Sequence, residues 1–259
     1  MDLSLVIVTR NEEKHLARCF ESVPFAGEVL VVDSGSTDST IGIARTLGCR
    51  VMHHSFTDYS SQKQWALEQA RYDWVLFLDA DEYLDPDLSG AIRSLLLKGP
   101  DRDGYRLRFR MLYMGRLMRL GPWSGESHLR LIRKASASFS GSHVHEGLVL
   151  ESGRPGILRK GHVVHESYED LSEQIDKMRA YASMWARGEH SAGRRAGPSP
   201  MILRPLWRLF SSCILRGGIL EGVPGLTASV VASFYVFLKW SMLREMTMRS
   251  NPGGEDRVR

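Results

Sequence analysis

Three apolar segments decide the fold: Leu3–Thr9 (LSLVIVT), Glu28–Asp33 (EVLVVD) and Trp74–Asp79 (WVLFLD). Continuous apolar runs of this length are typical of strands that are buried on both faces of a sheet. A further short strand is expected at Arg50–His53, and helical spacing between the strands predicts helices at Glu12–Ser22, Asp38–Leu47 and Ser60–Ala70. Because strands that alternate with helices form βαβ units, we expect an α/β, Rossmann-like fold with a mostly parallel sheet flanked by helices.

The next part of the chain predicts one more helix and two strands. Pro86 and Asp87 open a helix at Leu88–Leu97. Polar and apolar residues then alternate in Tyr105–Tyr113 and in His128–Arg133, in the manner of strands at the edge of a sheet.

The sequence changes in character after residue 166. Leu171–Gly188 has the spacing of an amphipathic helix, Gly188–Pro200 has the composition of a loop, and Gly222–Leu238 contains no charged residue. We therefore expect an α/β domain at 1–168, a helical extension at 169–250 and a disordered tail at 251–259.

The charge is distributed unevenly between these parts. From Arg179 to the end, 12 Arg and Lys face five Asp and Glu, whereas the whole chain carries a net charge of only +4. Apolar residues accompany these basic ones, which favours an anionic membrane surface as partner over nucleic acid. Since Gly222–Leu238 is short for a membrane span of about 20 residues, an interfacial or re-entrant helix is expected. The alternative is a helix buried against the α/β domain.

Cysteine usage and the N-terminus bear on the compartment. Cys19, Cys49 and Cys213 lie far apart, which argues against a disulfide framework or a zinc module and favours a reducing compartment. Met1–Arg10 has neither a basic start nor a cleavage site of small residues, so it is expected to be a strand and not a signal peptide.

Polar side chains follow the apolar strands at their carboxyl ends, where an open parallel sheet binds ligands. Asp33 ends one strand, and Asp79 and Asp81 follow another. Two carboxylates at i and i+2 can approach one hard cation, Mg²⁺ or Mn²⁺. The sequence contains no GxxxxGK[ST], and no GxGxxG follows the first strand, which argues against P-loop and dinucleotide sites.

At this point a family resemblance is visible. LSLVIVTRNEEKHLARCFESV, EVLVVDSGSTDST and YDWVLFLDADEYL resemble the inverting glycosyltransferases of family 2, which have the GT-A fold. SSQKQWALEQA, the WSGESHLRLIR of Trp123–Arg133 and the VHE of Val144–Glu146 are similar to bacterial lipopolysaccharide-core β-glucosyltransferases. The resemblance covers most of the chain. It implies transfer of a hexose, glucose, from a UDP-sugar to a lipopolysaccharide-core or other glycolipid acceptor.

The resemblance also implies roles for single residues. Asp33 would bind the base, Asp79 would approach the ribose, and Asp81 would bind the divalent metal at the diphosphate. The full set implied to contact the nucleotide-sugar or the metal is Thr9, Asn11, Glu12, Asp33, Lys63, Asp79 and Asp81. Arg130 is a candidate to clamp a phosphate of donor or acceptor.

Inversion needs a general base near the acceptor hydroxyl, and a carboxylate is the usual solution. Glu126 and Glu146 are the leading candidates, and Glu166 ranks below them. His145 and His165 are candidates to complete the metal shell or to orient the base.

Two other functions fit the same sequence. One is transfer of the sugar to a polyprenyl phosphate, and the other is an inactive scaffold that binds glycan or membrane. If the chain transfers a sugar to a glycolipid, we expect it to be a peripheral protein on the cytoplasmic side of the bacterial cytoplasmic membrane.

Overall fold

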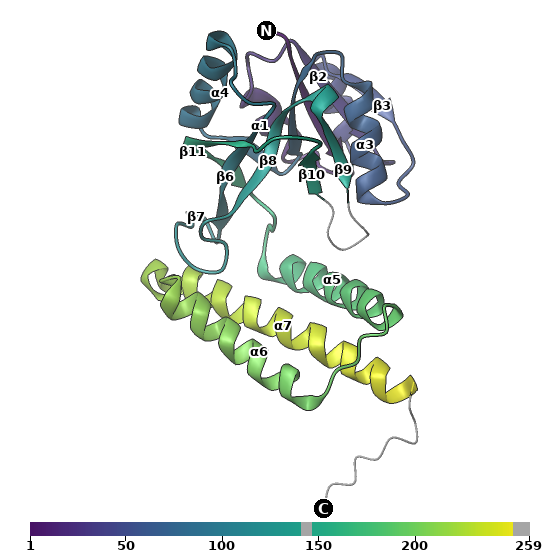
Figure 1. Ribbon diagram of the computed structural model, residues 1–259, viewed down its shortest axis with the longest axis vertical. Coiled ribbons are helices and arrows are strands. Elements are labelled where there is room, and N and C mark those ends of the chain that lie inside the picture. The colour runs from purple at the N-terminus through teal and green to yellow at the C-terminus, as the bar shows by residue number, and fades with distance from the viewer. Residues whose placement is uncertain (141–146, 251–259) are drawn as a thin grey trace, which may run out of the picture. The chain divides into compact units, whose positions relative to one another are not determined.

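The computed structural model describes residues 1–140 and 147–250, so the predicted disordered tail lies outside the described residues. These residues form two compact units (Figure 1). The α/β unit comprises Met1–Met111 and Gly125–Glu166. The helical unit comprises Leu112–Ser124 and the described residues from Ser167 onward.

One sheet, with strand order β3-β2-β1-β4-β8-β6-β11-β5, forms the centre of the α/β unit. Its strands are β1 (Leu3–Thr9), β2 (Glu28–Asp33), β3 (Arg50–His53), β4 (Trp74–Asp79), β5 (Glu82–Leu84), β6 (Gly104–Tyr113), β8 (Ser127–Arg133) and β11 (Gly156–His165). The first four strands have the bounds expected from the sequence and pair in parallel. Beyond them the sheet is mixed, since β8 is antiparallel to β4 and to β6, β11 is parallel to β6, and β5 is antiparallel to β11.

The expected edge position of two strands is wrong. Strand β8 pairs with β4 and β6, and β6 pairs with β8 and β11, so both lie inside the sheet. Their alternation has another cause: in β6, Phe109 and Met111 are buried, whereas Arg108 is exposed. Antiparallel sheets commonly have one solvated face, and such strands alternate even in the middle of a sheet.

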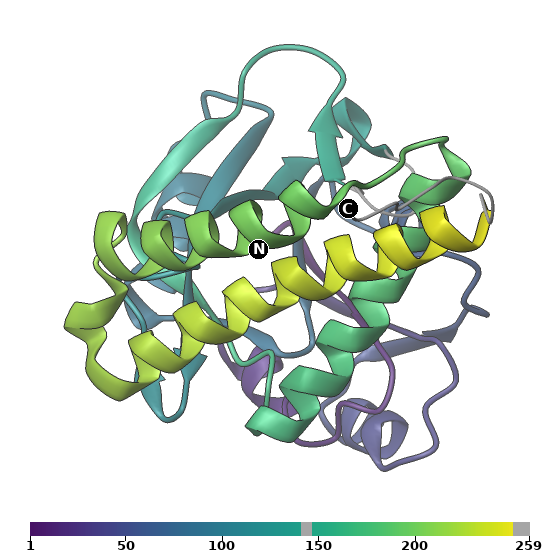
Figure 2. The same cartoon turned by 90° about the horizontal axis from the view of Figure 1, so that it is seen from below.

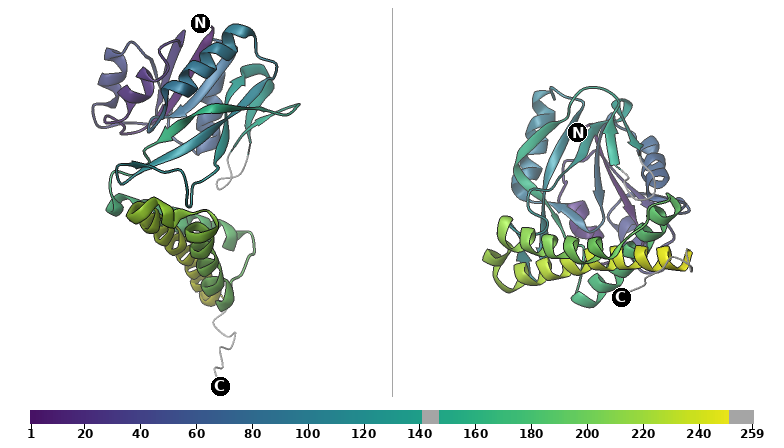
Figure 3. Two further views of the ribbon diagram at one scale, coloured as in Figure 1. Left: turned by 90° about the vertical axis from the view of Figure 1, so that its left-hand side faces the viewer. Right: turned by 60° about the horizontal axis from the view of Figure 1, so that its bottom comes forward.

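Helices cover the parallel part of the sheet on both faces (Figures 1 and 3). The helices of this unit are α1 (Leu16–Glu21), α2 (Thr40–Thr46), α3 (Tyr59–Gln69) and α4 (Pro86–Lys98). Leu5 and Ile7 pack in one core cluster with residues of α1, α2 and α4, whereas Val6 packs with α3 in a second cluster. Neighbouring strand residues thus face different layers, as the period of two requires.

Helix α1 begins later than the sequence indicates, at Leu16 instead of Glu12. The backbone N–H of Glu12 donates to Thr40 Oγ1 at 2.8 Å, and that of Glu13 donates to Asp38 Oδ2 at 3.2 Å. Asn11 has a φ of 57°, in the left-handed region that Asn tolerates. Residues 13–15 form a turn ahead of the helix, in which the backbone N–H of His15 donates to Glu12 O at 3.1 Å.

Strand β11 has no counterpart among the expected elements. Between Leu158 and Val163 its register shifts, and Gly161 there has a φ of 75°. A Cβ on Gly161 would lie 2.2 Å from the backbone nitrogen of Leu88, so only glycine fits so close to the start of α4. Asp85 caps α4 by accepting from Leu88 N, and it also accepts from His162 N. These contacts fix the end of β11, where His165 lies.

A short hairpin and a single turn complete the α/β unit. Strands β9 (Ala137–Ser140) and β10 (Gly147–Leu150) pair antiparallel, and a 3₁₀ turn, Lys134–Ser136, precedes them.

The helical unit consists mainly of α5 (Leu171–Ser191), α6 (Pro198–Phe210) and α7 (Gly222–Ser250). A π-helical turn, Ser211–Leu215, and a 3₁₀ turn, Gly218–Glu221, join α6 to α7, and β7 (Arg116–Leu117) pairs with the end of β6. Helices α6 and α7 lie side by side, and α5 packs against α7 (Figure 2). Buried Glu221, directly before α7, accepts hydrogen bonds from the backbone N–H groups of Arg119 and Leu120. These bonds tie the start of α7 to the segment that follows β7.

Helix α7 extends well beyond the uncharged segment seen in the sequence. The stretch Gly218–Ser250 has 33 residues, and its most apolar window of 18 residues has a mean hydropathy of 1.4 and is 22% buried. By length and composition it could cross a membrane, so shortness alone does not favour an interfacial position.

Candidate active site

The loops after β1 and β2 are joined by hydrogen bonds. Asn11 accepts from Thr37 N at 2.8 Å through its side-chain oxygen, and its own N–H donates to Ser36 Oγ at 2.9 Å. Asp33 is 1% exposed and accepts from Gly35 N at 2.8 Å and from Ser36 N at 3.0 Å. Asp33 and Asn11, which we expect to contact the nucleotide-sugar, therefore hold the two loops at this edge of the sheet.

Thr9 and Glu12 lie at the same edge. Thr9 pairs in register with Asp33, and its hydroxyl is buried without a hydrogen-bond partner among the described residues. Glu12 binds His15 Nδ1 at 2.8 Å, and this hydrogen bond raises the pKa of His15. The orphan hydroxyl of Thr9 is a donor and acceptor that a ligand could satisfy.

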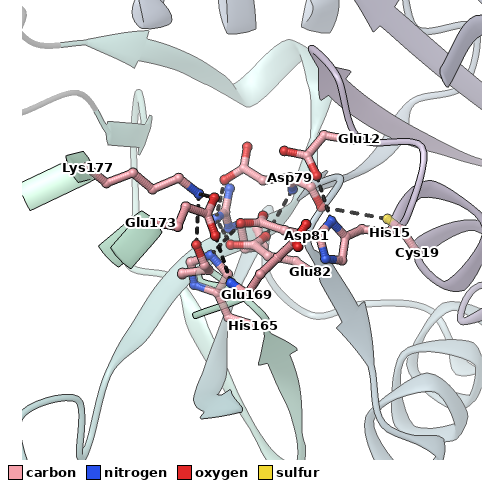
Figure 4. A network of polar contacts seen from close by, with 12 residues as sticks. Glu12, His15, Cys19, Asp79, Asp81, Glu82, His165, Glu169, Glu173 and Lys177 are labelled. Carbon is pink, nitrogen blue, oxygen red and sulfur yellow. Dashed lines mark hydrogen bonds and ion pairs between the residues drawn. The ribbon is translucent and has the colours of Figure 1, made fainter. Parts of the chain in front are cut away.

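Asp79 ends strand β4 (Figure 4), and its carboxylate lies between two cations. Its Oδ1 is 3.0 Å from Lys63 Nζ, and its Oδ2 is 3.1 Å from Arg130 Nη2. Burial alone would raise the pKa of Asp79, but the charges of Lys63 and Arg130 hold it well below its usual range. The carboxylate is thus ionised, and the structure brings together three expected site residues from α3, β4 and β8.

A residue that the sequence did not single out completes this cluster. Glu82 is 1% exposed, binds Arg130 Nη2 at 2.6 Å, and accepts from the backbone N–H of Asp79 at 3.0 Å. Burial raises the pKa of Glu82, with Asp79 adding to the rise, although Arg130 opposes it. Glu82 positions Arg130 and the end of β4. Its place in the DADE run, at the end of an apolar strand, was the available signal.

Asp81 contacts His165 across the sheet edge. His165 Nε2 lies 3.1 Å from Asp81 Oδ2, and the backbone N–H of Glu166 donates to Asp81 O at 2.9 Å. Burial lowers the pKa of His165, but the hydrogen bond and charge of Asp81 outweigh it, and the net shift is upward. One carboxylate and one imidazole are ligand types that Mn²⁺ accepts, with substrate phosphates to complete the shell.

The other two expected metal ligands, Asp79 and His145, do not belong to the Asp81–His165 pair. Asp79 is held by the two cations, and His145 lies outside the described residues. Among the residues that the structure describes, no group of three or more His, Cys, Asp or Glu is placed to hold a metal ion by itself. Asp81 and His165 fit a metal that is shared with a substrate, as Mg²⁺ commonly is in phosphate sites.

The candidates for the general base are separated by their surroundings. Glu126 is half-buried directly before β8, and its backbone carbonyl accepts from Phe109 N at 3.0 Å. Glu166 forms an ion pair with Arg18, whose guanidinium lies 5.0 Å from the centre of the Tyr83 ring. Glu146 lies outside the described residues.

Known proteins are similar to this chain over nearly its whole length. Residues 4–102 match the model of "Glycosyl transferase family 2". The lipopolysaccharide core biosynthesis glycosyltransferase LpsC of Rhizobium meliloti is 30% identical over 99% of this chain and 97% of its own length. The chain belongs to glycosyl transferase family 2. This family 2 glycosyltransferase is also 30% identical to the uncharacterized glycosyltransferase RT0209 of Rickettsia typhi, over 96% of this chain and 88% of that protein.

A solved structure supports the fold of this glycosyltransferase. The S. aureus TarS 1–349 crystal structure aligns with a TM-score of 0.50 and 16% identity, covering 99% of this chain and 93% of that one. The expected GT-A-like α/β fold with a C-terminal helical part is confirmed.

Proposed function

We propose that this glycosyltransferase is an inverting, metal-dependent enzyme that transfers glucose from a UDP-sugar to a lipopolysaccharide-core glycolipid. One observation supports the binding site for the sugar donor: Lys63 and Arg130 both contact Asp79 at the end of β4. Asp79 lies close to Asp81 and His165 (Figure 4). The relative that acts in lipopolysaccharide core biosynthesis supports the acceptor class.

Charge arrangement supports a diphosphate leaving group. Lys63 and Arg130 lie at this edge, where Asp79 and Glu82 balance their charges. A divalent metal bound by Asp81 and His165 would add positive charge and act as a Lewis acid on the phosphate oxygens. Preorganised positive charge stabilises negative charge that develops as the sugar leaves. Asp79 stays ionised because of the same two cations, and so it can accept a hydrogen bond from a ribose hydroxyl.

We assign the general base to Glu126. Glu166 forms an ion pair with Arg18, which places it below the other candidates. Glu126 is half-buried on the segment that leads into β8 and Arg130. Glu146 stays the alternative that the sequence left open. In this role Glu126 removes the proton of the acceptor hydroxyl on the face opposite to the leaving group, as inversion requires.

We further propose that the helical unit holds the enzyme on the inner face of the cytoplasmic membrane. The length and hydropathy of Gly218–Ser250 and the exposure of many large apolar side chains on α6 and α7 support it. A lipid-anchored acceptor would then be within reach.

The test is calorimetric titration with UDP-, GDP- and dTDP-sugars, each with and without Mn²⁺ or Mg²⁺, on the wild type and on Asp81→Ala. Asp87→Ala is the matched control, because the Asp87 side chain is 70% exposed on α4. We expect metal-dependent binding of one UDP-sugar. In an assay of sugar transfer from that donor, the rate should fall about 10²-fold or more in Asp81→Ala and stay unchanged in Asp87→Ala.

Transfer that persists at the wild-type rate in Asp81→Ala would refute the metal role. Failure of the folded wild type to bind any donor would refute the donor assignment itself.

A further inference from the structure

The helical unit contains a basic pocket of about 560 Å³. It lies among α5, α6 and α7, and none of the described residues that line it is a carboxylate. Its cations are Arg194, Arg204, Arg208, Arg216 and Lys239. We call it the basic pocket. Its volume is in the range of sites that take small ligands or headgroups.

Tryptophan rings hold two of these cations in place. The Arg204 guanidinium lies 4.3 Å from the centre of the Trp240 ring, and the Lys239 ammonium lies 4.3 Å from that of Trp185. The two rings pack edge to face with their centres 5.3 Å apart. Because stacking fixes the cations without neutralising them, the pocket keeps its positive charge.

Neutralising partners are scarce inside the pocket. Among the described residues, the side chains of Arg204 and Arg216 have no carboxylate partner; Arg216 Nη1 donates to Pro122 O at 3.0 Å. Arg194 differs, since it pairs with Glu189 at 2.6 Å. Arginines gathered in a concave site repel one another, and an anion with several acceptor oxygens relieves this repulsion. Phosphate suits guanidinium groups, which bind it through two parallel hydrogen bonds.

Exposed apolar side chains accompany the pocket on α6. Leu203 is 63% exposed, Leu206 is 58% exposed, and Trp207, which lines the pocket, is 62% exposed. A soluble anion would leave these side chains in water. A lipid would cover them with its acyl chains while its headgroup enters the pocket.

We propose that the basic pocket binds the phosphate group of an anionic lipid headgroup. Arg204 and Arg216 bind the phosphate oxygens, and the apolar side chains of α6 contact the acyl region. This inference rests on the membrane association proposed above, and it is independent of the sugar-transfer chemistry.

The test is co-flotation of the full chain with vesicles of phosphatidylcholine alone, or with added phosphatidylglycerol or phosphatidic acid at equal negative charge. We expect binding to increase in that order, because a phosphomonoester offers more acceptor oxygens. Arg204→Gln with Arg216→Gln should weaken binding to phosphatidic acid vesicles at least about tenfold. Arg179→Gln with Arg187→Gln removes the same charge from exposed positions on α5, and should change binding less than about threefold.

Two further arms identify what is recognised. Arg204→Lys with Arg216→Lys keeps the charge but loses the paired hydrogen bonds, and should lose the preference for phosphatidic acid. Titration with glycerol 3-phosphate tests a soluble source of the same group, and should give no more than weak binding.

The outcomes separate the two proposals. If no vesicle binds the folded wild type, the membrane association fails, and this inference fails with it. If vesicles bind equally well to the wild type and to both glutamine pairs, only the basic pocket is refuted. Tight binding of glycerol 3-phosphate that depends on Arg204 and Arg216, without vesicle binding, would overturn the lipid source.

Discussion

The two units treat charge and apolar surface in opposite ways. In the α/β unit, Glu82 and Asp79 are matched by Arg130 and Lys63, and among described residues only five large apolar side chains are exposed. In the helical unit, most large apolar side chains of α6 are exposed, and Arg204 and Arg216 have no carboxylate partner within the described part of the chain. The surface of the α/β unit is therefore suited to water, since its buried charges are paired and little apolar surface is exposed. The surface of the helical unit suits an anionic, partly apolar environment.

The largest expected effect tests the charges. Arg130→Met leaves Glu82 buried without its cation, and should lower the free energy of unfolding of the α/β unit by about 3–5 kcal/mol. Arg204→Met in the helical unit loses only a stacked, exposed cation and should cost no more than about 1 kcal/mol.

Urea-dependent hydrogen exchange of amides in β4 and in α7 reports each unit separately. Equal losses of unfolding free energy in Arg130→Met and Arg204→Met would contradict the difference between the two units. An α/β unit that is more stable in Arg130→Met than in the wild type would contradict it as well.

The next effect tests the apolar side chains. Leu76 on β4 is fully buried, so Leu76→Ala should cost about 2–5 kcal/mol through lost contacts and a cavity. Leu206→Ala, at a 58% exposed position on α6, should cost less than about 0.5 kcal/mol. Chemical denaturation followed by the same amides gives both values. A cost above about 2 kcal/mol for Leu206→Ala would show that this face is covered in the folded protein in water.

The smallest effect concerns pH. The hydrogen bond that protonated His15 donates to Glu12 raises the pKa of His15 in the folded state above its ordinary value near 6.5. The resulting stabilisation is therefore complete below that value and is lost as the pH rises through the folded-state pKa. Because the pair is only partly buried, the change is less than about 1 kcal/mol.

The measurement is the pH dependence of unfolding between pH 6 and 8 in the wild type and in His15→Gln. We expect the wild type to lose more stability than the variant across this range. Identical profiles would show that the pair contributes nothing to the stability of the α/β unit.

Much of the donor side could be inferred from short-range sequence pattern. Each of Asp33, Asp79 and Asp81 follows a continuous apolar strand, and parallel strands bring their carboxyl ends to one edge. Glu82 was missed because the DADE run marks the end of a strand but does not distinguish a buried carboxylate from a solvated one. Its burial depends on Arg130, which is 48 residues away along the chain.

The sequence by itself determined the four parallel strands, the family and the carboxylates at the strand ends, because these depend on local apolar runs and on motifs that lie close together. Only the tertiary structure decided the interior position of β6 and β8, the existence of β11, the contact of Asp81 with His165, and the basic pocket. Each of these depends on pairing or packing between segments far apart along the chain, and alternation or charge in one segment does not specify its partner.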